Sequence, residues 1–357
     1  MKKIAVIDVA AENSGAKSLF DDFITFISSN NRNIDYQWDI YTSCLEIKET
    51  GNIKLYKDQN IKKSWIHRII WENITFPNIN KRKKYDLIIS LQNKGVPVKS
   101  VKQIVYFHNI LLTQNKIKFS PIKKSERLLY IYSKVLGPLS IRSLKNVSAV
   151  FVQNTTTLNN LKNKIKNIPI FIIKPNINIQ NIRNQKRSKK INGFVYPATA
   201  HSYKCHNLII KAVQEENWDQ NFKIIFTING NENSYAQEIM EKCINNSHFK
   251  FVGQLDRSHL LNIYKDYGVI NCSKLESFCF PLYEAQVFKT PIISVNEDYA
   301  KEALENYSYA YICQPKSKEL AHSMKKALKN EYPNWITFDN ELTSQWDIMM
   351  NWINTNI

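Results

Sequence analysis

Short apolar runs recur along both halves of the chain, separated by polar or helix-periodic stretches. The first run opens the sequence as MKKIAVIDVA, and it is followed by a polar loop with Gly15 and by the helix-periodic segment LFDDFITFI. Apolar runs alternating with helices are typical of parallel sheets that helices cover on both faces. The pattern predicts a doubly wound α/β fold. Further strands of the N-terminal half are expected at residues 86–89, 103–107, 149–152 and 170–173.

The alternation starts again after a polar, basic stretch, QNIRNQKRSKKIN, at residues 180–192. That stretch has no apolar periodicity, so we interpret residues 181–192 as a linker between two Rossmann-like domains. A length of 357 residues also favours two domains. We expect an N-terminal domain at 1–180 and a C-terminal domain at 193–340, with strands at 193–199, 222–230, 249–255, 268–273 and 291–295.

The last segment, SQWDIMMNWINTNI, has apolar residues at helical spacing: Trp346, Met349, Met350 and Ile353. We predict a packing helix within residues 341–357 that returns to the first domain.

The segment ESFCFPLYEAQVFKTPIIS, which begins at Glu276, combines two carboxylates, a proline and an apolar strand. Pro281 suits the first turn of a helix, so a helix is expected from about Pro281 to Phe288. The backbone amides before that helix would form an anion-binding site at its positive end: those of Ser277, Phe278, Cys279 and Phe280. Glu276 precedes this site and Glu284 lies one turn inside the helix. This arrangement suits a nucleotide diphosphate-sugar, although an acidic residue in a first helical turn is also common on a solvated helix.

The same segment resembles the E-x7-E motif of retaining glycosyltransferases of the GT4 family, which have the GT-B architecture and include enzymes of bacterial surface-polysaccharide synthesis. The resemblance implies two Rossmann-like domains that face each other across a cleft, where the substrates bind. It also implies that Glu276 approaches the donor sugar and that Glu284 holds the ribose.

Three other residues match segments of that family. VYFHN resembles the segment in which a histidine contacts the donor sugar, so His108 is assigned a positioning and electrostatic role. YPATAHSYKCHN resembles the segment that supplies a phosphate-binding lysine, which implies that Lys204 neutralises the diphosphate. Gly15 corresponds to the glycine of the first loop, near donor or acceptor. Each has a simpler interpretation as well, namely a packed histidine, a surface lysine and a turn glycine.

The chain departs from the family at a few positions. Many members carry an arginine six residues before the lysine, where this chain has Ala198, and the sequence does not show what replaces it. Glycine is frequent in the family at the positions of Cys279 and Lys289.

The formal net charge of +18 is distributed unevenly. Residues 1–180 hold 29 Lys and Arg against 12 Asp and Glu, whereas residues 181–357 hold 20 against 19. An apolar and aromatic stretch, LLYIYSKVLGPL at residues 128–139, lies among these cations. The combination favours an anionic membrane surface as a partner, although a basic surface around a core helix would have the same composition.

Several kinds of chemistry are disfavoured. The six cysteines form no C-x-x-C pair and there is no D-x-D, so we expect no metal and no cofactor. A G-x-G-x-x-G fingerprint is lacking, which disfavours nicotinamide and flavin enzymes. No recognised nucleic-acid-binding motif is present, so nucleic acid is not an expected partner. Neither a signal peptide nor an apolar run of 18 residues is visible, which predicts a cytoplasmic protein, peripheral on the inner face of the plasma membrane.

The sequence therefore predicts a metal-independent, retaining hexosyltransferase. Its donor would be a nucleotide diphosphate-sugar and its acceptor a lipid-linked or oligosaccharide glycan of O-antigen, lipopolysaccharide or capsule synthesis. Two alternatives remain at this point. One is a GT-B-shaped nucleotide-sugar epimerase, and the other is a non-enzymatic basic protein on membrane or nucleic acid.

Overall fold

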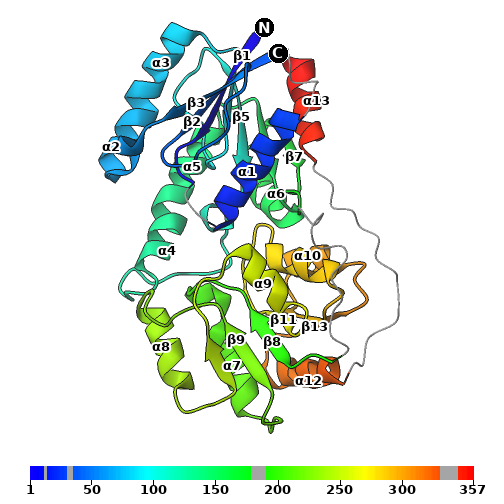
Figure 1. Cartoon of the computed structure of the whole chain (residues 1–357). Coiled ribbons are helices and arrows are strands. Elements are labelled where there is room, and N and C mark those ends of the chain that lie inside the picture. The colour runs from blue at the N-terminus through cyan, green and yellow to red at the C-terminus, as the bar shows by residue number, and fades with distance from the viewer. Residues whose placement is uncertain (12–13, 30–34, 178–189, 330–344) are drawn as a thin grey trace. The chain divides into compact units, whose positions relative to one another are not determined.

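The computed structural model describes residues 1–11, 14–29, 35–177, 190–329 and 345–357 (Figure 1). The chain divides into two compact units. Unit 1 comprises Met1–Gln114, Tyr132–Asn176 and Leu342–Ile357, and unit 2 comprises Asn115–Ile131 and Ile177–Glu341. Residues 115–131 therefore group with the second unit, whereas the sequence pattern placed them in the first domain. Of the expected linker, only residues 190–192 are among the described residues.

Unit 1 is built on a seven-stranded sheet in which every pairing is parallel, with the order β3-β2-β1-β4-β5-β6-β7. β1 lies beside both β2 and β4, and Val6 pairs with Ile40 on one side and Ile89 on the other. The strands are β1 Lys2–Asp8, β2 Tyr36–Thr42, β3 Ile53–Lys57, β4 Leu87–Ser90, β5 Lys102–Phe107, β6 Ala149–Val152 and β7 Ile170–Ile172.

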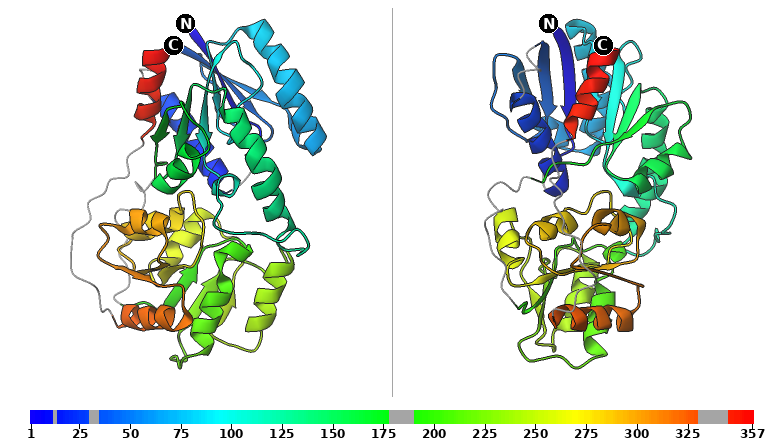
Figure 2. Two further views of the ribbon diagram at one scale, coloured as in Figure 1. Left: turned by 180° about the vertical axis from the view of Figure 1, so that it is seen from behind. Right: turned by 90° about the vertical axis from the view of Figure 1, so that its right-hand side faces the viewer.

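Helices cover both faces of this sheet because alternate strand residues point to opposite sides (Figures 1 and 2). On one face, Ile4, Val6 and Trp38 form a core with α1 and α13; on the other, Ala5 and Ile7 pack against Trp71 and Phe76. The helices of unit 1 are α1 Ser14–Ser29, α2 Trp65–Ile70, α3 Phe76–Lys83, α5 Gly137–Leu144, α6 Thr155–Lys162 and α13 Trp346–Asn356, with π-helical turns at Trp71–Thr75 and Tyr132–Leu136.

The C-terminal helix α13 packs in the core of unit 1. The Trp346 side chain is fully buried, and its ring centroid lies 5.0 Å from that of Phe23 and 5.1 Å from that of Tyr106. Its indole Nε1 donates a 2.7 Å hydrogen bond to Asp22 Oδ2 on α1. These contacts join the end of the chain to the sheet that begins it.

Unit 2 contains a six-stranded sheet, also parallel in every pairing, with the order β10-β9-β8-β11-β12-β13. Numbered within the unit, this is the 3-2-1-4-5-6 order of a Rossmann fold. The strands are β8 Gly193–Tyr196, β9 Lys223–Phe226, β10 Phe249–Phe251, β11 Gly268–Asn271, β12 Ile292–Val295 and β13 Ala310–Cys313. The helices of the unit are α4 Arg127–Ile131, α7 His206–Gln214, α8 Ser234–Cys243, α9 Arg257–Ile263, α10 Phe280–Val287, α11 Asp298–Leu304 and α12 Ser317–Leu328.

Candidate functional site

Each sheet has one point at which the strand order reverses direction. In unit 2 this point lies between β8 and β11, which pair with each other at the centre of the sheet. Ligands of doubly wound sheets bind beyond the carboxyl ends of the strands at such a point, because the two connecting loops diverge there. The loops that leave β8 and β11 hold most of the residues that the sequence singled out.

An ion pair joins these two loops. Lys204 lies in a short 3-10 turn before α7, Glu276 lies in the loop after β11, and the Lys204 ammonium contacts the Glu276 carboxylate. Both side chains are mostly buried, with exposed fractions of 12% and 17%. Burial by itself would lower the pKa of Lys204, but Glu276 and Tyr203 hold that pKa above its usual range. Lys204 is therefore a fixed cation at the point where the strand order of unit 2 reverses.

The helix that follows is α10, which starts one residue earlier than expected, at Phe280, with Pro281 in its first turn. Cys279 has a left-handed backbone, with φ 55° and ψ 64°, and so turns the chain into the helix. The Phe278 side chain is buried and stacks on Tyr283, with centroids 4.4 Å apart. Because the first N–H groups of a helix have no intrahelical acceptor, the start of α10 provides donors and a positive dipole end.

Glu284 lies inside α10 and is 5% exposed. Its Oε1 is 2.9 Å from Nε of Arg257, the first residue of α9, whose side chain is 41% exposed. Burial raises the pKa of Glu284, and Arg257 opposes that rise. Glu284 is thus a packed carboxylate with a cationic partner, unlike the solvated helix starter that the sequence left as an alternative.

Cys279 lies within electrostatic reach of both acids and of the lysine. Burial raises the pKa of its thiol well above the usual value, Glu276 and Glu284 add to the rise, and Lys204 opposes it. All three charges therefore act on the Cys279 side chain, which directly precedes α10. Lys204, Glu276, Glu284 and the start of α10 thus lie in one region of unit 2.

Arg257 was missed by the sequence analysis. The signal for it is weak: it follows Asp256, whose carboxylate caps α9 by accepting the His259 N–H, and one arginine after a capping residue suggests only a helix start. Arg257 belongs to the candidate site because it forms an ion pair with Glu284, which lies 27 positions further along the chain.

His108 follows β5 in unit 1 and has protein partners. Its Nε2 is 2.9 Å from the Leu91 carbonyl oxygen and 3.2 Å from Asn93 Nδ2, and its backbone N–H donates to Asn93 Oδ1 at 2.6 Å. Burial lowers the pKa of the imidazole to about 4. The ring is therefore neutral near pH 7.

Gly15 differs from its expected place. It is the second residue of α1, Ser14–Ser29, and it is exposed, so it lies in the first turn of a helix rather than in the preceding loop. The helix predicted from the segment LFDDFITFI is present, but it begins before that segment.

The reversal point of unit 1, between β1 and β4, holds a buried acid that the sequence analysis missed. Asp8 ends β1 and is 2% exposed; its Oδ1 accepts the Ala11 N–H at 3.3 Å, and its Oδ2 has no hydrogen-bond partner among the described residues. Burial raises the pKa of Asp8 to about 7, against the opposing charges of Arg68 and Lys62. The sequence alone shows Asp8 only as the end of a strand, because the two cations that act on it lie more than 50 positions away.

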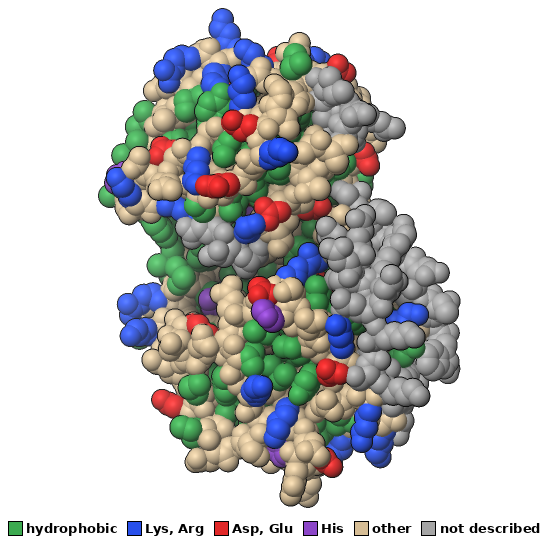
Figure 3. Space-filling view, viewed as in Figure 1, with side chains coloured by type: hydrophobic (Ala, Val, Ile, Leu, Met, Phe, Trp, Pro, Cys, Tyr) green, Lys and Arg blue, Asp and Glu red, His purple; other side chains and the backbone are tan. Residues whose placement is uncertain are grey.

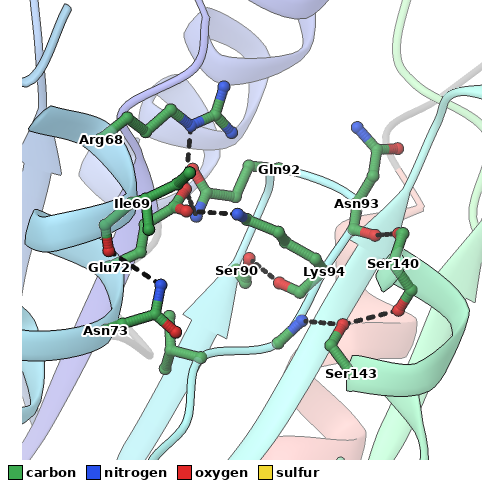
Figure 4. A network of polar contacts seen from close by, with 12 residues as sticks. Arg68, Ile69, Glu72, Asn73, Ser90, Gln92, Asn93, Lys94, Ser140 and Ser143 are labelled. Carbon is green, nitrogen blue, oxygen red and sulfur yellow. Dashed lines mark hydrogen bonds and ion pairs between the residues drawn. The ribbon is translucent and has the colours of Figure 1, made fainter. Parts of the chain in front are cut away.

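A polar network lies after β4 in the same unit (Figure 4). Buried Glu72, in the π-helical turn, accepts from Arg68 Nε at 2.9 Å and from Gln92 Nε2 at 3.2 Å, and it forms an ion pair with Lys94. This network fixes the position of Arg68, whose charge acts on Asp8.

Within the described ranges, no three or more His, Cys, Asp and Glu side chains lie together in a way that could hold a metal ion. Among the helices of the described part of the chain, none is long and apolar enough to cross a membrane.

The two Rossmann-like units define a fold class that known structures share. A structure of HepE from Anabaena in complex with UDP-glucose matches with a TM-score of 0.65 at 14% identity, covering 92% of this chain and 90% of that one. WaaG, a glycosyltransferase involved in lipopolysaccharide biosynthesis, matches with a TM-score of 0.64 at 12% identity, with 92% and 90% covered. The lipopolysaccharide outer core galactosyltransferase WaaB matches with a TM-score of 0.63 at 12% identity over 100% of both chains. These likenesses show the fold and confirm the predicted GT-B class.

Residues 178–343 match the family model described as glycosyl transferases group 1. This range includes Lys204, Glu276 and Glu284. A sequence comparison with curated proteins found no significant match.

Proposed function

We propose that this protein is a retaining glycosyltransferase that moves a hexose from a nucleotide diphosphate-sugar to a glycan or glycolipid acceptor in cell-surface polysaccharide synthesis. The observation that carries the proposal is the pairing of Lys204 with Glu276 at the reversal point of unit 2, beside the start of α10. The group 1 match over the same residues and the UDP-glucose held by the similar HepE structure support a nucleotide-sugar donor.

The ion pair suggests how donor binding and sugar positioning are linked. A diphosphate that reaches the start of α10 competes with Glu276 for the Lys204 ammonium, because two phosphate groups carry more negative charge than one carboxylate. Glu276 then accepts hydrogen bonds from the hydroxyls of the donor sugar, while Lys204 and the amides of residues 277–280 stabilise the leaving diphosphate. No metal or other cofactor is part of this proposal.

Glu284 is assigned to the ribose diol. It is buried and held by Arg257, so its carboxylate has a fixed position, which limits the entropy lost on binding. Arg257 supplies a cation beside Glu284. Many family members carry an arginine at the position that is Ala198 in this chain, and the Ala198 side chain is buried.

We assign the acceptor to unit 1. The Oδ2 of Asp8 is buried and has no hydrogen-bond partner in the described part of the chain, which suits it to an acceptor hydroxyl. His108, as a neutral imidazole, is suited to a positioning contact with the donor sugar. Retention of the anomeric configuration rests on the E-x7-E resemblance. A cytoplasmic location at the inner face of the plasma membrane, with an anionic membrane surface as partner and no nucleic acid, completes the proposal.

A thermal-shift panel tests the proposed activity. UDP-, GDP-, ADP- and dTDP-sugars are added separately, and a donor that binds raises the Tm with its concentration. The binding donor is then incubated with the protein alone. A transferase leaves the sugar stereochemistry of the unreacted donor intact, whereas an epimerase converts it. Failure of every nucleotide to shift the Tm would contradict the proposal.

A further inference from the structure

One face of α2 and of the turn after it is apolar and exposed. Trp65, Ile66, Ile69, Ile70 and Ile74 have exposed fractions of 59%, 67%, 53%, 45% and 57%. We call these five residues the α2 face. They fall within ten consecutive residues of one helical stretch, so they form one surface rather than scattered positions. Large contiguous apolar surfaces on soluble proteins mark sites of interaction.

The opposite side of the same helical stretch is anchored in unit 1. Trp71 and Phe76 are buried against Tyr41 and the sheet. Glu72 holds Arg68 and Lys94 from the same side, as Figure 4 shows. Rotating the helix to bury the isoleucines would expose Trp71. It would also break the ion pairs of the buried Glu72 carboxylate, which is strongly unfavourable. The α2 face therefore stays outward.

The charge of the segment that contains the α2 face indicates which partner binds there. Between Gln59 and Tyr85 the chain carries seven Lys and Arg residues and one acid, Glu72, which is buried. Exposed members of this set are Lys63, Lys81, Arg82 and Lys84. In Figure 3 hydrophobic side chains and a Lys or Arg lie together at the edge where Figure 1 draws α2.

We propose that the α2 face docks on an anionic lipid bilayer, with its apolar side chains at the boundary of headgroups and acyl chains. A tryptophan and four isoleucines lie on one face, with Lys63 just before it and Lys81, Arg82 and Lys84 at the far end of the same helical stretch, which matches the composition of interfacial helices. Cations near an anionic membrane surface add an electrostatic attraction to the burial of the apolar side chains. A second copy of this chain is a poorer occupant, because pairing two copies of this face would bring two sets of cations together.

This inference rests on the membrane association proposed above, and it specifies a surface different from the stretch at residues 128–139. In that stretch Leu128, Val135 and Leu139 are exposed, but Leu129 is buried and the residues are divided between the two units. The α2 face belongs wholly to unit 1. It also adjoins Arg68, whose charge acts on Asp8, so docking would bring the proposed acceptor residues near the membrane that holds a lipid-linked acceptor.

Co-sedimentation of the full chain with vesicles tests the inference. We expect binding to vesicles of phosphatidylethanolamine and phosphatidylglycerol, weak binding to phosphatidylcholine alone, and loss of binding as salt screens the cations. The double variant Ile66→Gln/Ile69→Gln should lower the partition coefficient about tenfold or more, since two apolar side chains no longer enter the bilayer. The matched variant Leu128→Gln/Leu139→Gln should bind like the wild type.

Three outcomes would overturn the inference. The α2 variant could bind as well as the wild type, the 128/139 variant could be the one that loses binding, or an oligonucleotide could displace the wild type from the vesicles. If the wild type binds no vesicles, membrane association and this inference both fall. The nucleotide-sugar thermal shifts of the same preparations show separately whether the proposed transferase site is intact. Because all four substituted side chains are exposed, both variants should keep the wild-type Tm.

Discussion

Lys204 and Glu276 are 72 positions apart, and they meet as a mostly buried ion pair between the loops that leave β8 and β11. The parallel pairing of these two central strands brings their carboxyl ends together, so the register of the sheet produces the contact. A pair like this can brace two loops, or it can hold two functional groups ready for a ligand. The proposed function requires the second role.

Glu276→Gln separates the two roles. We expect turnover to fall about 100-fold or more, because a neutral amide binds the donor sugar less strongly in the transition state. The affinity for the nucleoside diphosphate should not weaken, since Lys204 no longer shares its charge with a carboxylate. Steady-state kinetics and calorimetry measure the two quantities. A parallel loss of Tm, diphosphate affinity and turnover would indicate a structural brace instead.

Glu284→Ala should weaken nucleotide binding and leave the fold intact. Loss of the hydrogen bonds that the charged carboxylate accepts from the ribose hydroxyls corresponds to about 1.5–3 kcal/mol, or about 10- to 100-fold in Kd. Calorimetry with the nucleotide that binds the wild type gives the comparison, and Glu305→Ala, at an exposed glutamate after α11, is the control. Unchanged affinity in Glu284→Ala would remove this residue from the ribose site.

Asp8→Asn should stabilise the protein in a pH-dependent way. The folded-state pKa of about 7 lies above the ordinary value of 3.8, so the native state binds the extra proton between these values and the wild type loses stability as pH rises through that range. The amide removes this loss, and the advantage of the variant should grow from pH 4 to 7 and then level off, at most on the order of 4 kcal/mol. Urea unfolding at pH 5 and pH 8 measures it.

The same variant should have lower transferase activity if Asp8 binds the acceptor. Asp35→Asn, at an exposed carboxylate, controls for the loss of one negative charge. An Asp8→Asn protein with the same pH profile of unfolding as the wild type would contradict the buried, protonated state of Asp8.

Lys289→Gly should raise stability by about 0.5–1 kcal/mol. Lys289 has φ 51°, a left-handed conformation that costs a side-chain-bearing residue about 1–2 kcal/mol and costs glycine little. Thermal unfolding should show a Tm higher by about 2 °C. The same substitution at Lys326, an exposed position in the last turn of α12, should lower stability by up to about 1 kcal/mol, because glycine is a poor helix former. If both variants lose stability equally, the left-handed strain at Lys289 is absent.

Local patterns were sufficient for much of the fold. The apolar runs at residues 149–152, 268–273 and 291–295 lie on β6, β11 and β12, because a central parallel strand is buried on both faces and its residues are apolar throughout. β2 and β3 were missed, since YQWDIYT and IKLYK mix polar with apolar residues near the edge of the sheet. The left-handed backbone at Cys279 and Lys289 agrees with the glycines that the family resemblance places there.

The candidate site was predictable where its residues are close in sequence and not where they meet through the fold. Glu276, Glu284 and Pro281 share one segment, so their relation to the start of α10 could be inferred. The ion pair of Glu284 with Arg257 and the charge of Arg68 that acts on Asp8 both depend on the packing of separate elements. The α2 face could not be inferred either, because WIHRIIWENI has apolar residues on all sides, and only packing decides that Trp71 is buried while Ile66 and Ile69 are exposed.

The most direct test of the account compares nucleoside diphosphates with monophosphates in calorimetry of the wild type and of Lys204→Met. The control is Lys274→Met, at an exposed lysine of the loop that holds Glu276. The account predicts that the wild type and the control prefer the diphosphate by about tenfold or more, and that Lys204→Met loses this preference while it still binds the monophosphate. An undiminished preference for the diphosphate in Lys204→Met, or a wild type that binds neither ligand, would contradict it.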